Sequence, residues 1–132
     1  MLELVEDLRS EDPETQYAFE LEEGKEVDEN LNEKSIKGLM IMTGSMKRLY
    51  KNYHDVIFMD STYKTNKHEM PLVVIGGVDH DNKNIVLGFG FLKIEDNASY
   101  KWFMQTLLKF TEGIEPGTIL TDFDPAMAHG IE

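Results

Sequence analysis

The chain has 132 residues, no cysteine and a formal net charge of −12 at pH 7. This length fits one domain that can bury its own core. The lack of cysteine excludes a disulfide scaffold, a thiolate zinc site and a cysteine nucleophile. No apolar run approaches the roughly 20 residues of a membrane helix, and the acidic start is unlike a secretory or transit peptide. We therefore expect a protein that is not secreted and has no membrane partner.

The negative charge is concentrated at the beginning of the chain. Residues 1–34 contain 13 acidic and three basic side chains, whereas residues 35–132 contain 12 acidic and 10 basic ones. The net charges of the two segments are therefore −10 and −2, so the overall charge says little about what the second segment binds. We treat residues 1–34 as an acidic, solvated N-terminal extension and residues 35–132 as the main unit.

Apolar spacing predicts short elements in the first 53 residues. We expect a helix that ends near residues 12–13, a strand at 17–22, a polar loop at 24–34, a strand at 35–43 and a helix at 45–53. Ser45 would cap the last helix, and its core face would run from Met46 to Tyr53. Three basic side chains fall on its other faces and are expected to be solvated: Lys47, Arg48 and Lys51.

The pattern after residue 54 predicts a mixed α/β fold of the order β-β-β-α-β-α. We expect strands at 55–60, 71–78 and 85–92, a helix at 98–112, a strand at 118–122 and a final helix from residue 124. The apolar run VIFM in the first of these strands is typical of a strand buried on both faces. Two hairpins and a right-handed crossover would make the fourth strand parallel to the first.

Asp60 and Asp122 are candidate metal ligands at the ends of these two strands. Each follows an apolar run, where an unpaired carboxylate costs several kcal/mol unless it is neutralised or paired. If the two strands are neighbours, the two carboxylates approach each other, and paired carboxylates suit a hard cation such as Mg²⁺. The alternative is that both are ordinary strand-end residues.

Three segments in register resemble the Mutator-like element (MULE) transposases. They are DSTYKTNK at residues 60–67, SYKWF at 99–103 and LTDFD at 120–124. The related plant far-red-impaired-response proteins share the first motif. The resemblance implies a ribonuclease H-like core with an Asp-Asp-Glu triad, in which Asp60 is the first acid, Asp122 the second and Mg²⁺ or Mn²⁺ the cofactor. It also implies a nuclear parent protein that cuts and joins DNA.

The third acid of this triad cannot be assigned. In the family it lies beyond a further strand, before which this chain ends, and Glu132 comes too early. We therefore expect the last core strand and helix to be missing, metal binding to be weak and strand transfer to be absent. One alternative is a domesticated, non-catalytic module that associates with DNA or regulates transcription. Another is an unrelated acidic binding domain.

The remaining candidate residues each have two interpretations. Lys64 and Lys67 could contact DNA phosphates or belong to a solvated turn. Trp102 could stack on a DNA base or pack against another element. Glu95 matches a glutamate of the family, but it could equally cap a helix. Because part of the fold is expected to be missing, an apolar face or sheet edge should be exposed, and this predicts a homo-oligomer.

Overall fold

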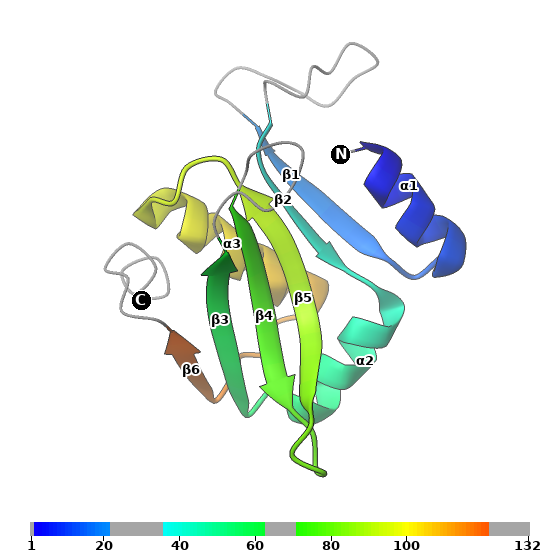
Figure 1. Cartoon of the computed structure of the whole chain (residues 1–132), viewed down its shortest axis with the longest axis vertical. Helices are drawn as coiled ribbons and strands as arrows, with labels where there is room; N and C mark the ends of the chain where they lie inside the picture. The colour runs from blue at the N-terminus through cyan, green and yellow to red at the C-terminus, as the bar shows by residue number, and fades with distance from the viewer. Residues whose placement is uncertain (1, 22–35, 63–70, 122–132) are drawn as a thin grey trace.

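The computed structural model of the chain describes residues 2–21, 36–62 and 71–121, which form one mixed sheet with helices on both faces (Figure 1). The helices of these ranges are α1 (Leu2–Glu11), α2 (Gly44–Tyr53) and α3 (Asn97–Phe110). The strands are β1 (Gln16–Leu21), β2 (Ile36–Met42), β3 (Val56–Thr62), β4 (Leu72–Val78), β5 (Asn84–Leu92) and β6 (Thr118–Thr121). None of these helices has the length and hydropathy needed to cross a membrane.

The strands lie in the order β1-β2-β5-β4-β3-β6. β4 pairs antiparallel with both β3 and β5, and β6 pairs parallel with β3. The chain passes through α3 between β5 and β6. The predicted β-β-β-α-β order and the parallel pairing of its first and fourth strands are therefore confirmed. The expected loop at 24–34 and the expected helix from residue 124 lie outside the described residues.

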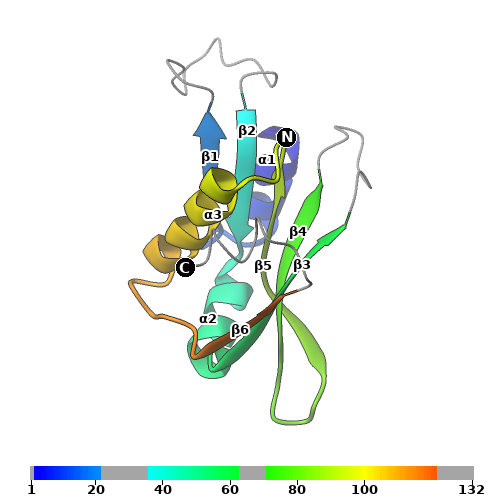
Figure 2. The same cartoon turned by 90° about the vertical axis from the view of Figure 1, so that its left-hand side faces the viewer.

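Two hydrophobic clusters occupy opposite faces of the sheet, with α3 on one side and α1 on the other (Figure 2). Tyr50 of α2 and Phe103 of α3 are fully buried in the larger cluster with Ile75 of β4. Each such side chain contributes about 1.5–3 kcal/mol by leaving water. Val5 of α1 packs in the smaller cluster with Leu39 of β2. The core therefore depends on α2 and α3 on one face and on α1 over part of the other.

The strand β3 is buried on one face only, so the prediction of burial on both faces is wrong. Ile57 and Met59 are 0% and 1% exposed, whereas Val56 and Phe58 are 44% and 36% exposed. Successive side chains of a strand point to opposite faces. The apolar run therefore places two residues in the core and two on an open face. α1 leaves this face uncovered because it lies beside β1, at the far side of the sheet from β3 and β6 (Figure 1).

The described helices end within two residues of the predicted positions, and the cap of α2 differs from the prediction. Thr43 is the cap there in place of the predicted Ser45, and its Oγ1 accepts a hydrogen bond of 3.2 Å from the Met46 backbone N–H. Asp96 caps α3. After α3, the Gly113 backbone N–H donates to the Leu108 carbonyl (2.7 Å), and Gly113 has a φ of 84°. This left-handed conformation is one that glycine adopts without steric cost.

The acidic N-terminal segment joins the same sheet through β1. β1 pairs antiparallel with β2 from Gln16 to Leu21. Glu20 departs from the solvated surface that we expected, because its side chain is only 14% exposed and lies 3.6 Å from the Lys37 ammonium group. Burial raises the pKa of Glu20, and the positive charge of Lys37 opposes this rise. At least one acidic side chain of this segment, Glu20, is therefore packed against β2 and is not solvated.

Candidate metal centre

Asp60 lies near the carboxyl end of β3, opposite Val74 of β4. Its side chain is exposed and shares the open face of the sheet with Phe58. Within the described residues, the carboxylate of Asp60 makes no hydrogen bond or ion pair. The expected cost of burying an unpaired carboxylate therefore does not arise here, and the interpretation of Asp60 as a desolvated acid is wrong. Its oxygens are open to a ligand from solvent.

The second candidate acid, Asp122, lies outside the described residues. The strand that precedes it, β6, runs parallel to β3, with Ile119 opposite Ile57 and Thr121 opposite Met59. Each of the two candidate acids follows the last of these paired residues directly in the chain. The pairing therefore brings the carboxyl ends of the two predicted strands side by side. The metal hypothesis depends on this arrangement of the two strands.

The described residues alone do not complete a metal site. Among them, no three histidine, aspartate or glutamate side chains lie together in a group that could hold a metal ion. Hard divalent cations are bound by carboxylate, carbonyl and water oxygens. Asp60 has the right donor chemistry and is accessible, so it fits such an ion as one ligand of several.

Glu95 has a different position from the one that a cap would require. Its Oε1 accepts hydrogen bonds from the Ser61 hydroxyl group and from the Tyr100 hydroxyl group, the latter at 2.8 Å. Asp96 is the residue that caps α3, through its Oδ1 and the Ser99 backbone N–H at 2.8 Å. Glu95 therefore ties the end of β3 to the start of α3. It lies across the sheet from Asp60, because Ser61 and Asp60 are consecutive and point to opposite faces.

The three residues proposed to contact DNA are only partly described. Lys64 and Lys67 lie outside the described residues. Trp102 is half-buried against the larger hydrophobic cluster, and its Cζ3 is 3.3 Å from the position that a Cβ atom at Gly38 would take. Its packing on the sheet is therefore confirmed, whereas a contact between Trp102 and DNA stays a prediction.

A groove lined by basic side chains was not predicted from the sequence. Lys47, Arg48 and Lys51 of α2, which we expected on a solvated face, line it together with Arg9 of α1 and Lys109 of α3. No motif could have indicated this site, because the five residues come from three elements that are distant in the sequence.

The comparisons with known proteins identify a family for the second part of the chain. The family model of the MULE transposase domain matches residues 56–132, which run from the start of β3 to the end of the chain. The chain therefore belongs to the MULE transposase domain family. No solved structure matches it.

Several plant proteins are similar to the chain. FAR1-RELATED SEQUENCE 10 of Arabidopsis thaliana is 32% identical over 79% of the chain and 15% of its own length. FAR1-RELATED SEQUENCE 6 of the same plant is 43% identical over 53% of the chain and 10% of its own length. FAR1-RELATED SEQUENCE 11 is 25% identical over 98% of the chain and 18% of its own length. The chain spans less than a fifth of the length of these relatives.

Proposed function

We propose that the chain is the front part of a ribonuclease H-like transposase core whose parent protein cuts and joins DNA in the nucleus. Asp60 and Asp122 are the first two acids of an Asp-Asp-Glu triad and hold Mg²⁺ or Mn²⁺. The parallel pairing of β3 with β6 is the observation that supports this proposal most directly, because the two acids follow paired residues of these strands. The membership of the chain in the MULE transposase domain family agrees with it.

The proposed roles of Asp60 and Asp122 follow from the chemistry of carboxylate ligands. A divalent cation supplies positive charge to the oxygens of a reacting phosphate. Asp60 offers an accessible carboxylate as a ligand, and Asp122 offers the second. In the parent, water attacks a phosphodiester and breaks its bond to the 3′-oxygen, which leaves as a 3′-hydroxyl group. This hydroxyl group then attacks a second phosphodiester and displaces the 3′-oxygen of that strand, which leaves as a hydroxyl group. Because no third acid can be assigned among the 132 residues, we expect the chain alone to carry out neither step.

The replacement Asp60→Asn tests the metal proposal. We expect the unchanged chain to bind Mn²⁺ with a Kd weaker than about 0.1 mM, because two carboxylates only partly satisfy such an ion. Asp60→Asn removes a charged ligand and should weaken binding by about tenfold or more. Free Mn²⁺ in a titration is measured by electron paramagnetic resonance.

Asp55→Asn is the matched control for this experiment. Asp55 directly precedes β3, at the opposite end of the strand from Asp60, and its side chain is 90% exposed. We expect Asp55→Asn to bind Mn²⁺ as the unchanged chain does. An equal loss in both variants, or none in Asp60→Asn, would show that Asp60 is not a ligand. Micromolar binding by the unchanged chain would show a more complete site than we propose.

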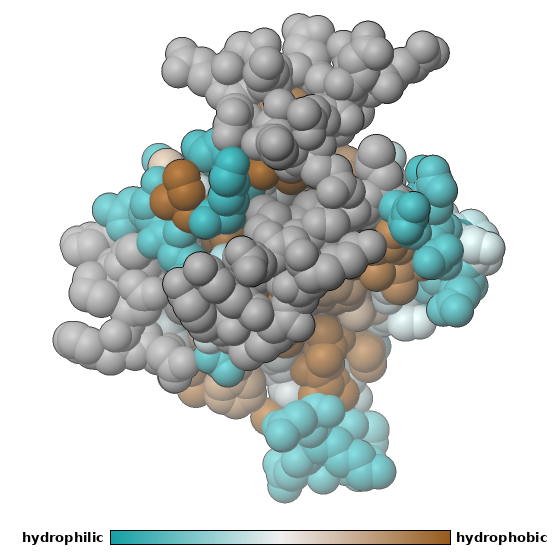
Figure 3. Space-filling model, turned by 45° about the horizontal axis from the view of Figure 1, so that its top comes forward, coloured by the Kyte–Doolittle hydropathy of each residue, from teal (hydrophilic) through white to brown (hydrophobic). Residues whose placement is uncertain are grey.

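A second candidate function, a non-catalytic interaction module, is favoured by an apolar row on the open face. Leu120, Phe58, Gly76 and Val86 lie opposite one another across β6, β3, β4 and β5. The three side chains of this row other than glycine are 36–47% exposed. Figure 3 shows apolar surface next to the hydrophilic tip of the β4–β5 turn. Exposed apolar surface of this kind marks association sites, and we propose a second copy of the chain as the occupant.

The double replacement Phe58→Ser/Leu120→Ser tests this association. We expect the unchanged chain to form dimers in sedimentation velocity and the double variant to shift at least about tenfold toward monomer, since it loses two apolar side chains. Ile94→Ser is the control, because Ile94 is 50% exposed but lies outside the strands. The proposal fails if the unchanged chain is monomeric at about 100 μM, a concentration at which even a weak dimer would be populated. It also fails if Ile94→Ser has the same effect as the double variant.

A further inference from the structure

A groove of about 890 Å³ lies between the α1–β1 turn, α2 and the end of α3. Five basic side chains line it: Arg9, Lys47, Arg48, Lys51 and Lys109. Two acidic ones, Glu14 and Glu112, also line it, so that its net charge is +3. The chain as a whole has a net charge of −12. The groove is therefore a local concentration of positive charge on an acidic protein.

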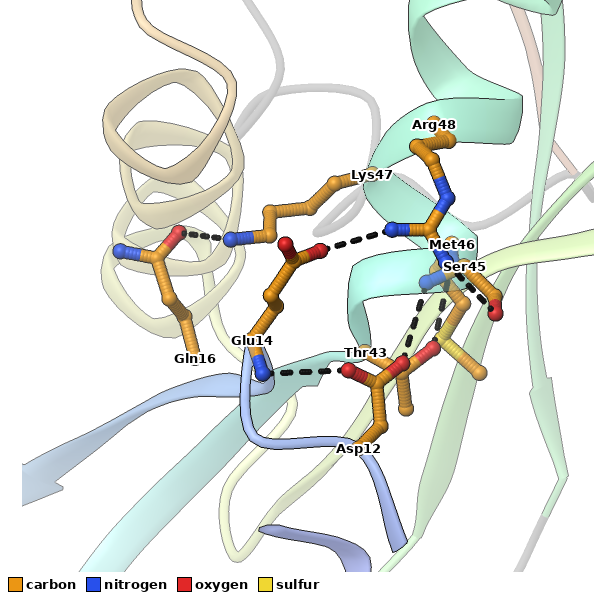
Figure 4. A network of polar contacts seen from close by, with 8 residues as sticks. All are labelled: Asp12, Glu14, Gln16, Thr43, Ser45, Met46, Lys47 and Arg48. Carbon is orange, nitrogen blue, oxygen red and sulfur yellow. Dashed lines mark hydrogen bonds and ion pairs between the residues drawn. The ribbon is translucent and has the colours of Figure 1, made fainter.

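Only part of this positive charge is neutralised by neighbouring side chains. Arg48 Nη1 lies 2.7 Å from Glu14 Oε2 in an exposed ion pair, and Lys47 Nζ donates to the neutral amide oxygen of Gln16 at 3.0 Å (Figure 4). In the part of the chain that the structure describes, no ion pair involves Lys51 or Lys109. These two lysines come from different helices and face a common groove, so both are available to an anionic ligand.

The groove lacks the features that a peptide ligand would require. Tyr50 and Phe110, its two aromatic lining residues, are only 0% and 8% exposed. Peptides and proteins usually anchor themselves by inserting side chains into apolar pockets, and a stacked base needs an exposed ring. What the groove offers is positive charge, while its two aromatic lining residues are buried. This favours a phosphate backbone over an acidic peptide and over base recognition.

The groove is separate from the candidate metal centre. α2 ends at Tyr53, just before β3 begins at Val56, whereas Asp60 lies near the other end of β3. The two features therefore lie toward opposite ends of one strand. Any ligand of the groove would be held away from the candidate acids, and its binding would not require a metal ion.

We propose that this basic groove binds the phosphate backbone of nucleic acid without reading its sequence. Such binding releases counterions, so the logarithm of the affinity falls with the logarithm of the salt concentration in proportion to the number of phosphates contacted. The inference stands on the charges of the groove and does not depend on the proposed catalytic activity of the parent. We expect Lys51 and Lys109 to contribute most to this binding, because neither forms an ion pair with a carboxylate of the described residues.

The test is binding of a fluorescent 20-base-pair duplex by the full chain, followed by anisotropy in EDTA at 25–150 mM NaCl. We expect Lys51→Gln/Lys109→Gln to weaken binding by about tenfold at low salt and to reduce the salt slope by about two, one for each lysine that no longer neutralises a phosphate. Lys83→Gln/Lys101→Gln is the matched control, because it removes the same charge from exposed lysines that do not line the groove. This control should keep the slope.

Three results would overturn the proposal: an unchanged slope in the groove variant, an equal loss in both double variants, or a poly-glutamate peptide that binds as tightly as the duplex. Circular dichroism establishes that each variant is folded. The variant Asp60→Asn is included to separate the two proposals. If the metal proposal alone fails, duplex binding in EDTA is retained, and if the groove proposal alone fails, Mn²⁺ binding is retained.

Discussion

Replacing Gly90 by alanine is expected to lower the free energy of unfolding by about 3 kcal/mol or more. Gly90 lies in the middle of β5, between Met40 of β2 and Val73 of β4. A Cβ atom at this position would overlap the Leu39 carbonyl oxygen and lie 2.7 Å from Cε2 of Phe103. Overpacking a core by a single methyl group costs about 1–3 kcal/mol when side chains can adjust. Here a strand backbone would have to move, so the cost should reach or exceed the upper value.

Gly88→Ala provides the matched control for this prediction. Gly88 is two residues away on β5, and a Cβ atom there would meet Cγ of Met42 at 3.3 Å and Cε of Met40 at 3.4 Å. Methionine side chains adjust readily, so we expect a change below about 1 kcal/mol. Urea unfolding of the three proteins measures the difference. Equal stabilities of the two variants would mean that β2 and β5 do not approach as closely as the structure has them.

The periodicity of the sequence was sufficient to predict the elements and their order. Strands have an apolar period of two and helices a period near 3.6, and these local signals predicted α3 and the strands around it. The open face of β3 could not be predicted in this way. Val56 and Phe58 continue the apolar run of Ile57 and Met59. The two pairs differ only in packing, because Ile57 and Met59 lie in the larger cluster with α2 and α3, whereas α1 does not cover Val56 and Phe58.

The candidate site was predicted from a motif, and its environment was not. The motif around Asp60 indicated a metal ligand, and the strand order predicted a parallel partner for β3, which is β6. The exposure of Asp60 was missed because it follows from the open face of β3. The basic groove was also missed, since the contacts that assemble it are between side chains of separate elements, such as Arg48 and Glu14. Local patterns carry no information about such contacts.

The stability of the protein is expected to fall above pH 10 by about 2 kcal/mol more than it does in a Tyr50→Phe variant. Burial and the nearby charge of Glu115 raise the pKa of Tyr50 from 10.0 to about 12. Its hydroxyl group donates to the Ile114 carbonyl oxygen at 2.7 Å, and its side chain is fully buried. The folded state therefore holds the tyrosine proton more tightly than the unfolded state does. This contribution to stability is complete below pH 10 and is lost as the pH rises from 10 to 12.

Tyr53→Phe is the matched control, because it also removes a tyrosine hydroxyl group from α2. Tyr53 also lies on α2, but its hydroxyl group contacts the exposed His80 ring at 2.7 Å instead of a buried carbonyl group. We expect the pH dependence of Tyr53→Phe to follow that of the unchanged protein and that of Tyr50→Phe to be flatter. Urea unfolding at pH 9–12, a range that starts about one unit below the expected transition, measures this difference. Parallel curves for all three proteins would mean that Tyr50 ionises as easily in the folded chain as in water. The contact between α2 and the segment after α3 would then be looser than the hydrogen bond to Ile114 requires.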